Sequence, residues 1–302
     1  MNSGRASATN AMTVDVEDYF QVSAFEQVVD RRDWQDFESR VERNTHKILD
    51  LFDVSKLKAT FFVLGWVAER EPNLVREIAA RGHEVACHGF AHQLVYRQER
   101  ATFAAETARS KQILEDIVQA PVTGYRAASY SITKSSLWAL DIIADLGFKY
   151  DSSIFPVHHD RYGIPGAPDR IHRIALANSS ELIEFPLSSY DFMGNNIPVA
   201  GGGYFRLYPY SLTRWFLNRL SATGRPFVFY VHPWEVDPEQ PRIKEASAMS
   251  RFRHYLNLER CEARLERLVA DFSFTTMQQV LTTVHGGDPN GLPVHNYSLE
   301  VA

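Results

Sequence analysis

The sequence predicts an α/β protein in which helices cover a parallel β-sheet. Short apolar runs alternate with amphipathic segments along most of the chain, which is the pattern of repeated βα units. Acidic residues, histidines and an arginine stand at or just after several of the apolar runs. In a parallel barrel the loops after the strands share one face, so these polar residues would meet at one mouth.

The elements of the first half alternate regularly. Residues 11–16, AMTVDV, alternate in hydropathy and lead into acidic residues, as a strand with carboxylates at its carboxyl end would. Residues 58–65 form a short apolar run closed by a glycine, which predicts a buried strand. The expected strands are 11–16, 58–65, 83–89, 122–128 and 149–155, and the expected helices are 38–53, 73–82, 99–118 and 135–147.

The second half shows fewer regular elements. Residues 182–188 and 226–233 fit two more strands, and the glycines of 200–210 suggest a tight loop that lines a cleft. Residues 246–272 carry apolar side chains near helical spacing, which predicts an amphipathic helix packed on the barrel or on another subunit.

The length of 302 residues suits one large α/β domain. We expect this domain over residues 11–285, with 236–285 as a helical extension packed on it. Residues 1–10 and 286–302 are expected to be flexible termini.

Composition excludes several classes of protein. Hydrophobic residues make up 45% of the chain and charged residues 23%, as in soluble globular proteins, and the net charge of −5 argues against nucleic-acid binding. No apolar run approaches the ~18 residues of a membrane span, and the N-terminal segment lacks the apolar core of a signal peptide, so we expect a cytoplasmic protein. Cys87 and Cys261 are too few for a disulfide framework or a cysteine zinc cluster.

The stretch ACHGFAH, residues 86–92, suggests half of a metal site. His88 and His92 are four residues apart, so both could bind one cation if the segment between them turns helically. Catalytic zinc sites commonly combine two histidines with a carboxylate and leave one position open. The alternative is a pair of histidines that bind no metal and are either on the surface or satisfied by hydrogen bonds. His158 and His159 are a weaker rival pair, because adjacent side chains seldom converge on one ion.

Asp15 and Glu17 could supply the carboxylates. They are two residues apart in an extended segment, so both would point to one face. One could bind the metal while the other takes a proton from water. The alternative is a helix N-cap with solvated acidic neighbours.

Three further polar residues follow strand-like runs. Arg126 could hold a catalytic carboxylate ionised, although a structural ion pair would look the same. His232 is placed to protonate a leaving group, with Asp151 to orient it, or it is a packed core histidine. Tyr204 offers a stacking surface for a sugar, as Tyr208 and Tyr210 also do.

The order of these motifs resembles that of the polysaccharide deacetylases of carbohydrate esterase family four, the NodB-homology fold. The motifs are TVDVED, HGFAH, YRAAS, YDSSI and FYVHP. DVEDYFQV, GGGYFRLYPY and VHPWEVDP are similar to the subgroup found with exosortase and PEP-CTERM exopolysaccharide loci. The resemblance implies a distorted (β/α) barrel that uses a divalent metal, Zn²⁺ above all, to remove acetyl groups from N-acetylated sugars.

The resemblance also implies a role for each motif residue. Zn²⁺ and a backbone N–H near Ser129 would stabilise the oxyanion. Asp15 would be the catalytic base, His88 and His92 two metal ligands, Arg126 the brace of the base, Asp151 the tether of the catalytic histidine, and His232 that histidine, the general acid.

Two positions depart from the family pattern. Val16 follows Asp15, where adjacent aspartates are common, so Glu17 is expected as the third ligand, with Asp18 as the alternative. Ala128 replaces a common proline in the oxyanion loop.

Three functions fit these residues. The first is a metal-dependent N-deacetylase of a bacterial exopolysaccharide or peptidoglycan-like glycan, acting at the inner face of the membrane. The second is a metal-independent hydrolase of small cyclic amides on the same fold, in which His88 and His92 would not both be needed. The third is a non-catalytic carbohydrate-binding barrel, in which the acid and base would not be retained.

Overall fold

The computed structural model describes residues 9–176 and 181–297. Within them, one sheet of ten strands runs in the order β10-β1-β2-β3-β4-β5-β7-β6-β12, with β11 beside β1. All neighbouring pairs are parallel except β6 with β7. The strands are β1 (Asn10–Val16), β2 (Thr60–Val63), β3 (Glu84–Cys87), β4 (Gly124–Tyr125), β5 (Tyr150–Asp151), β6 (His172–Ala175), β7 (Glu181–Glu184), β10 (Val228–Val231), β11 (Phe274–Thr275) and β12 (Val294–His295), and a separate hairpin holds β8 (Ser189–Phe192) and β9 (Asn195–Pro198).

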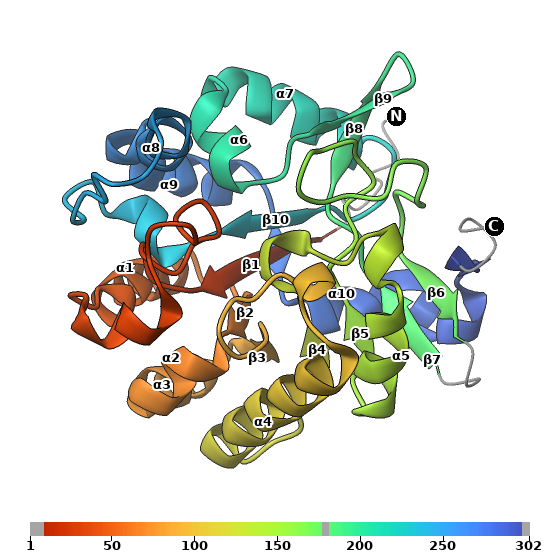
Figure 1. Cartoon of the computed structure of the whole chain (residues 1–302). Helices are drawn as coiled ribbons and strands as arrows, with labels where there is room; N and C mark the ends of the chain where they lie inside the picture. Colours follow the sequence, from red (N-terminus) through yellow and green to blue (C-terminus); the bar gives the residue numbers. More distant parts are fainter. Residues whose placement is uncertain (1–8, 177–180, 298–302) are drawn as a thin grey trace.

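Helices surround the central strands (Figure 1). In this view α2 to α5 lie along the lower side and α6 to α9 along the upper side, so the predicted α/β class with a parallel sheet is confirmed. The helices are α1 (Val41–Val54), α2 (Gly65–Arg70), α3 (Pro72–Ala80), α4 (Arg100–Val118), α5 (Trp138–Asp145), α6 (Gly202–Leu207), α7 (Tyr210–Ser221), α8 (Ala248–Tyr255), α9 (Cys261–Asp271) and α10 (Met277–Thr283).

Alternation along the strands gives the sheet two apolar faces. On β1, Met12, Val14 and Val16 join the large buried cluster that also contains the helix side chains Ile48 and Leu49. The strand residues that alternate with these point to the opposite face of the sheet and join a second buried cluster, the inner cluster. It includes Ala11, Phe62, Ala86 and Tyr230. Because side chains alternate strictly along a strand, this second set of residues continues to Asp15, His88 and His232.

The hydrogen-bonded ladder has β10 at one end and β12 at the other. Chain between β7 and α6 lies against the free side of β10. The N–H of Tyr230 donates to the carbonyl oxygen of Ala200 at 2.9 Å, and the N–H of Val228 donates to Ser188 Oγ at 2.9 Å. These contacts give β10 hydrogen-bonding partners on the side away from β1, while the strand ladder itself stays open.

The predicted continuous helix over 246–272 is wrong. Helix α8 ends at Tyr255, Asn257 has a left-handed backbone with φ of 53°, and α9 begins at Cys261. Apolar spacing continues across the break, which is why periodicity alone did not reveal it. Leu265 and Leu268 of α9 belong to the main buried cluster, so the extension packs on the barrel.

Two other expectations differ from the structure. The glycine-rich stretch 200–210 holds helix α6 and the start of α7 rather than a loop, since Gly201 and Gly202 take positive φ just where α6 begins. Within the tail expected to be flexible, β12 pairs with β6 and Tyr297 is buried, its hydroxyl 2.9 Å from His172 Nε2. Residues 1–8 and 298–302 of the expected flexible termini lie outside the described residues.

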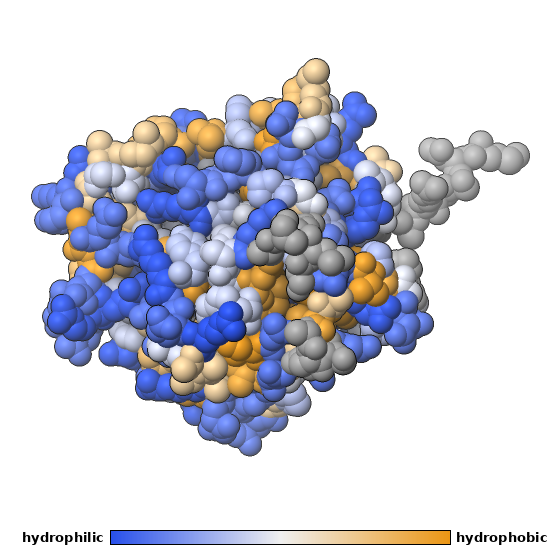
Figure 2. Space-filling model, turned by 45° about the vertical axis from the view of Figure 1, so that its right-hand side comes forward, coloured by the Kyte–Doolittle hydropathy of each residue, from blue (hydrophilic) through white to orange (hydrophobic). Residues whose placement is uncertain are grey.

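One face of the molecule is mainly polar. Figure 2 shows a face on which hydrophilic residues predominate, with hydrophobic atoms in scattered groups. Over the described residues, the helices are too short or too polar to cross a bilayer.

Candidate active site

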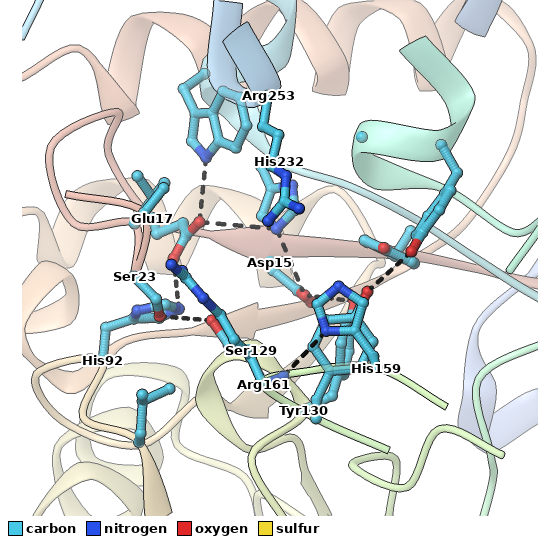
Figure 3. A pocket seen from close by; sticks show the side chains of 18 of the residues that line it. Asp15, Glu17, Ser23, His92, Ser129, Tyr130, His159, Arg161, His232 and Arg253 are labelled. Atoms are coloured by element: carbon cyan, nitrogen blue, oxygen red, sulfur yellow. Dashed lines mark hydrogen bonds and ion pairs between the residues drawn. The ribbon is translucent and has the colours of Figure 1, made fainter. Parts of the chain in front are cut away.

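The carboxyl ends of β1, β3 and β10 open into one cavity of about 440 Å³. Most of the predicted site residues line it, and Figure 3 shows Asp15, Glu17, His92 and His232 turned toward one another. The lining residues are Asp15, Glu17, Val22, Ser23, Ala24, His88, His92, Leu94, Ser129, Tyr130, His159, Arg161, Tyr162, Gly203, Tyr204, Leu207, Tyr230, His232, Trp234, Phe252, Arg253 and Leu256.

Glu17, His88 and His92 form a buried group of metal-ligating side chains. One ligand atom from each lies within 4.8 Å of the others, and His92 Nε2 is 2.8 Å from Glu17 Oε2. Burial alone would raise the pKa of Glu17, but the neighbouring histidines, His92 above all, outweigh it and lower the pKa to about 2. Burial lowers the pKa of His88 to about 4, so its imidazole is neutral at pH 7, as a metal ligand must be.

Hydrogen bonds outside this group fix its orientation. His88 Nδ1 lies 2.8 Å from the carbonyl oxygen of Arg126, which leaves Nε2 as the free ligand atom. The indole N–H of Trp234 donates to Glu17 Oε1 at 3.1 Å. Two imidazoles, one carboxylate and an adjoining cavity match the donor set of a catalytic zinc site.

Asp18, the alternative ligand, is engaged elsewhere. Its Oδ2 accepts hydrogen bonds from the backbone N–H groups of Arg40 and Val41, at the start of α1, and from Ser39 Oγ. The geometry therefore favours Glu17 as the third ligand.

Asp15 forms a buried ion pair with Arg126. Arg126 Nη1 donates to Asp15 Oδ1 at 2.6 Å and to Thr13 Oγ1 at 2.8 Å, and the guanidinium also contacts the backbone and side chain of Ser152. The side chains of Asp15 and Arg126 are 3% and 0% exposed, so solvent screens the pair little. The hydroxyl of Tyr130 reaches Asp15 Oδ2 at 3.4 Å.

His232 lies across the cavity from this ion pair. Its Nε2 is 3.7 Å from Glu17 Oε1 and 4.0 Å from Asp15 Oδ2, while Nδ1 is 3.1 Å from Glu235 Oε2. Burial alone would lower the pKa of His232, but Glu235, with help from Glu17 and Asp15, raises it to about 9.

Asp151, expected to orient His232, does not do so. Its neighbour Tyr150 belongs to the inner cluster, so the pleat points Asp151 to the opposite face, directly across from Glu184 of β7. There Asp151 accepts hydrogen bonds from the N–H and hydroxyl of Ser153. Glu235 occupies the position beside His232 that was predicted for Asp151.

Ser129 and Tyr204 both line the cavity. Ser129 has a left-handed backbone, with φ of 50°, and its hydroxyl is 2.6 Å from that of Ser23. The hydroxyl of Tyr204 lies 3.4 Å from that of Tyr162.

The rival pair of histidines does not converge on one ion. His158 is exposed, whereas the ring of His159 stacks on Tyr162 in the cavity wall, with 3.8 Å between centroids.

Sequence reasoning missed Trp234 and Glu235. Both belong to the 3₁₀ turn Pro233–Val236 that follows His232. A glutamate three residues after a polar residue is the spacing of a capping box, and the turn forms one, since Glu235 Oε2 also accepts from the N–H of His232 at 3.0 Å. That spacing could have identified Glu235.

Two family models match separate parts of the chain. Residues 30–150 match the family model of polysaccharide deacetylase. This part of the chain is similar to the polysaccharide deacetylases. Residues 152–282 match a second model, described as a domain of unknown function (DUF3473). The expected link to exosortase loci stays a prediction.

Curated relatives match parts of the chain. A chitooligosaccharide deacetylase of Bradyrhizobium sp. is 30% identical over 100 residues, which are 33% of this chain and 43% of that protein. A peptidoglycan-N-acetylglucosamine deacetylase of Bacillus cereus is 36% identical over 70 residues, 23% of this chain and 26% of that protein. The chain thus spans less than half the length of these relatives.

The fold likeness covers nearly the whole chain. A Mycobacterium smegmatis structure assigned to the polysaccharide deacetylases superposes with a TM-score of 0.63 at 21% identity, covering 94% of this chain and 93% of that one.

Proposed function

We propose that this protein is a metal-dependent hydrolase that removes N-acetyl groups from a glycan. The observation that carries the proposal is the meeting, in one cavity, of the Asp15–Arg126 ion pair, the three ligating side chains and His232. The curated relatives are named for chitooligosaccharides and peptidoglycan N-acetylglucosamine, which supports an N-acetylated bacterial polysaccharide as the substrate.

Glu17, His88 and His92 would hold the metal. Their donor set favours Zn²⁺, which when bound supplies Lewis-acid polarisation of the acetyl carbonyl and makes water more acidic. The retained ligands favour this reaction over a metal-independent hydrolysis of cyclic amides, and the retained acid and base favour an enzyme over a binding protein.

Asp15 and His232 would exchange the protons. Asp15, held in place by Arg126, accepts a proton from the water that attacks the acetyl carbon. His232 donates a proton from Nε2 to the amide nitrogen as the C–N bond breaks, and acetate and a free amine leave. The left-handed turn at Ser129 would place a backbone N–H toward the oxyanion.

Tyr204 and Tyr162 would hold the sugar. Both rings line the cavity, with their hydroxyls 3.4 Å apart. Aromatic faces of this kind offer apolar surface to the C–H groups of a sugar ring, and the hydroxyls offer hydrogen bonds.

Metal analysis together with acetate release tests the proposal. We expect about one Zn²⁺ per chain, and release of acetate from N-acetylglucosamine oligomers that a chelator abolishes and zinc restores. His88→Ala should lose both the metal and the activity, because only two ligands remain. His158→Ala, an exposed histidine outside the cavity, is the matched control. Activity that is indifferent to chelator and to His88→Ala would contradict the metal mechanism.

A further inference from the structure

We propose that Glu235 and Arg206 position His232 for proton transfer, and that helix α8 of the C-terminal extension anchors them. The inference rests on the proposed function, in which His232 is the general acid. It assigns a role to a part of the chain that the family comparison leaves without one, because all three elements lie within residues 152–282.

Glu235 connects the imidazole to a buried guanidinium. Its Oε2 accepts hydrogen bonds from the backbone N–H of His232 at 3.0 Å and lies 3.1 Å from Nδ1, while its Oε1 accepts from Arg206 Nε at 2.6 Å. Glu235 is 1% exposed and Arg206 is 2% exposed. A buried carboxylate needs a cationic partner of this kind, because burial without one costs several kcal/mol, on the order of 3–5.

The other N–H groups of Arg206 donate hydrogen bonds to backbone carbonyl oxygens at the end of helix α8. Nη1 donates to the carbonyl oxygens of His254 at 2.7 Å and Leu256 at 2.9 Å, and Nη2 donates to that of Arg253 at 3.2 Å. The last carbonyls of a helix have no partner within the helix and carry the negative end of its dipole. The carbonyl groups at the end of α8 therefore hold the Arg206 guanidinium in one orientation. The guanidinium in turn holds the Glu235 carboxylate in place.

The consequence for His232 is a defined tautomer and a defined ring orientation. A carboxylate beside Nδ1 keeps a proton on that atom, so Nε2 is the nitrogen that faces Asp15 and Glu17 in the cavity. Asp151, on the other face of the sheet, cannot supply this contact.

A purely structural role would look different in experiment. An ion pair that only holds the turn Pro233–Val236 on the barrel would change stability when removed, but it would leave the tautomer of His232 unchanged. Glu235→Gln separates the two roles, because glutamine keeps the shape and a hydrogen-bonding oxygen but removes the charge. Arg206→Lys keeps a charge beside Glu235 but cannot reach three carbonyl groups at once.

The experiment combines imidazole nitrogen NMR with steady-state kinetics on the zinc-loaded protein. The signal of His232 is identified by its absence in His232→Gln. In spectra recorded at a pH high enough for the His232 imidazole to be neutral, we expect a single Nδ1-protonated form in the wild type and a mixture of tautomers in Glu235→Gln. With N-acetylglucosamine oligomers as substrate, we expect the kcat of Glu235→Gln to be about 100-fold below that of the wild type, with little change in KM. A loss of this size, about 100-fold, is within the usual range for general acid catalysis. The kcat of Arg206→Lys should lie between those of the wild type and Glu235→Gln. Glu235→Asp keeps the negative charge, so its kcat should be higher than that of Glu235→Gln.

Asp237→Asn is the matched control. Asp237 is a buried carboxylate two residues further on, paired with Arg40 and Arg43 rather than with His232. We expect it to lower stability without changing the His232 signal. An unchanged tautomer and unchanged kcat in Glu235→Gln would overturn the inference, and if that variant does not fold, an unchanged Arg206→Lys would do so. A changed tautomer in a protein that releases no acetate would reject the proposed function and keep the positioning role.

Discussion

Trp234 touches both the candidate metal ligands and the candidate general acid. Its indole N–H donates to Glu17 Oε1, one face stacks on His232 with 5.1 Å between centroids, and it also stacks on His254 of α8 at 4.1 Å. The side chain therefore does two things, since it orients a ligand through one hydrogen bond and supports the imidazole through its ring.

Trp234→Phe separates these contributions. The phenyl ring keeps much of the stacking but removes the only N–H of the side chain. We expect the affinity for Zn²⁺ to fall about 10- to 100-fold, the usual effect of losing a partner of a metal ligand, as measured by competition with a chelating dye. Trp138→Phe, on α5 outside the cavity, should leave the affinity unchanged. Equal affinities of Trp234→Phe and wild type would show that Glu17 needs no such support.

Single residues also mark what the sequence could and could not predict. Asp15, Glu17, His88, His92 and His232 were predicted together. The reason is that each of these residues lies at the carboxyl end of a strand or follows it, and parallel strands end at one edge. The error at Asp151 comes from the pleat, since one residue of register decides which face a side chain takes in a two-residue strand. Sequence offers little to fix that register.

At the scale of elements, β5 and β7 face each other with two carboxyl groups in register. Asp151 lies opposite Glu184, and both are fully buried. Burial, together with the Asp151 carboxylate, raises the pKa of Glu184 well above its usual value. The folded protein therefore holds a proton between these strands at pH values where the unfolded chain has lost it.

This pair predicts a pH dependence of stability. Because the folded pKa of Glu184 exceeds the unfolded one, its favourable contribution is complete below the unfolded pKa and declines as pH rises toward the folded pKa. Each pH unit in that window costs at most about 1.4 kcal/mol. Burial also raises the pKa of Asp151 to about 6, and Asp151 remains in the variant. Glu184→Gln should therefore reduce the decline, so urea midpoints of variant and wild type should diverge in favour of the variant from pH 5 to pH 8.

Glu181→Gln is the control for this measurement. Glu181 lies on the same strand but is exposed. The difference in urea midpoint between Glu181→Gln and wild type should stay constant from pH 5 to pH 8. A constant difference for Glu184→Gln as well would contradict a shared proton between β5 and β7.

Elements differed in how well the sequence predicted them. Strand β2 and helices α1 and α4 were found because four buried residues in a row, or several turns of periodic apolar residues, carry a strong signal. Helix α6 and strand β12 are short, and their order comes from tertiary contacts such as those of Arg206 and Tyr297. Local sequence has no access to such contacts.

At the scale of the whole molecule, two family matches share one sheet. Residues 30–150 supply His88, His92 and Arg126, residues 152–282 supply His232, and β1, outside both matches, supplies Asp15 and Glu17. Strand β10 pairs with β1, which pairs with β2. We therefore propose that residues 11–285 are a single domain and that neither matched region holds a complete site.

A single domain predicts a single unfolding transition. Trp66 and Trp234 lie in different matched regions, and the strands between them form one ladder. We expect tryptophan fluorescence and far-ultraviolet circular dichroism to give coincident urea curves, because the two regions share β1 and the main buried cluster. Two separated transitions would show that the matched regions unfold independently.

The place of β10 beside β1 also sets the order of events during synthesis. Thr13 Oγ1 donates to the carbonyl oxygen of Phe229, a partner 216 residues later in the chain. At roughly 5–20 residues per second, the ribosome needs about 10–40 s to make that partner. During this interval one edge of β1 lacks its β10 partner. The carboxylates of Asp15 and Glu17 also lack His232, which has not yet been made. That edge of β1 therefore stays without its β10 partner until late in synthesis, and His232 can join the site only after β10 has been made.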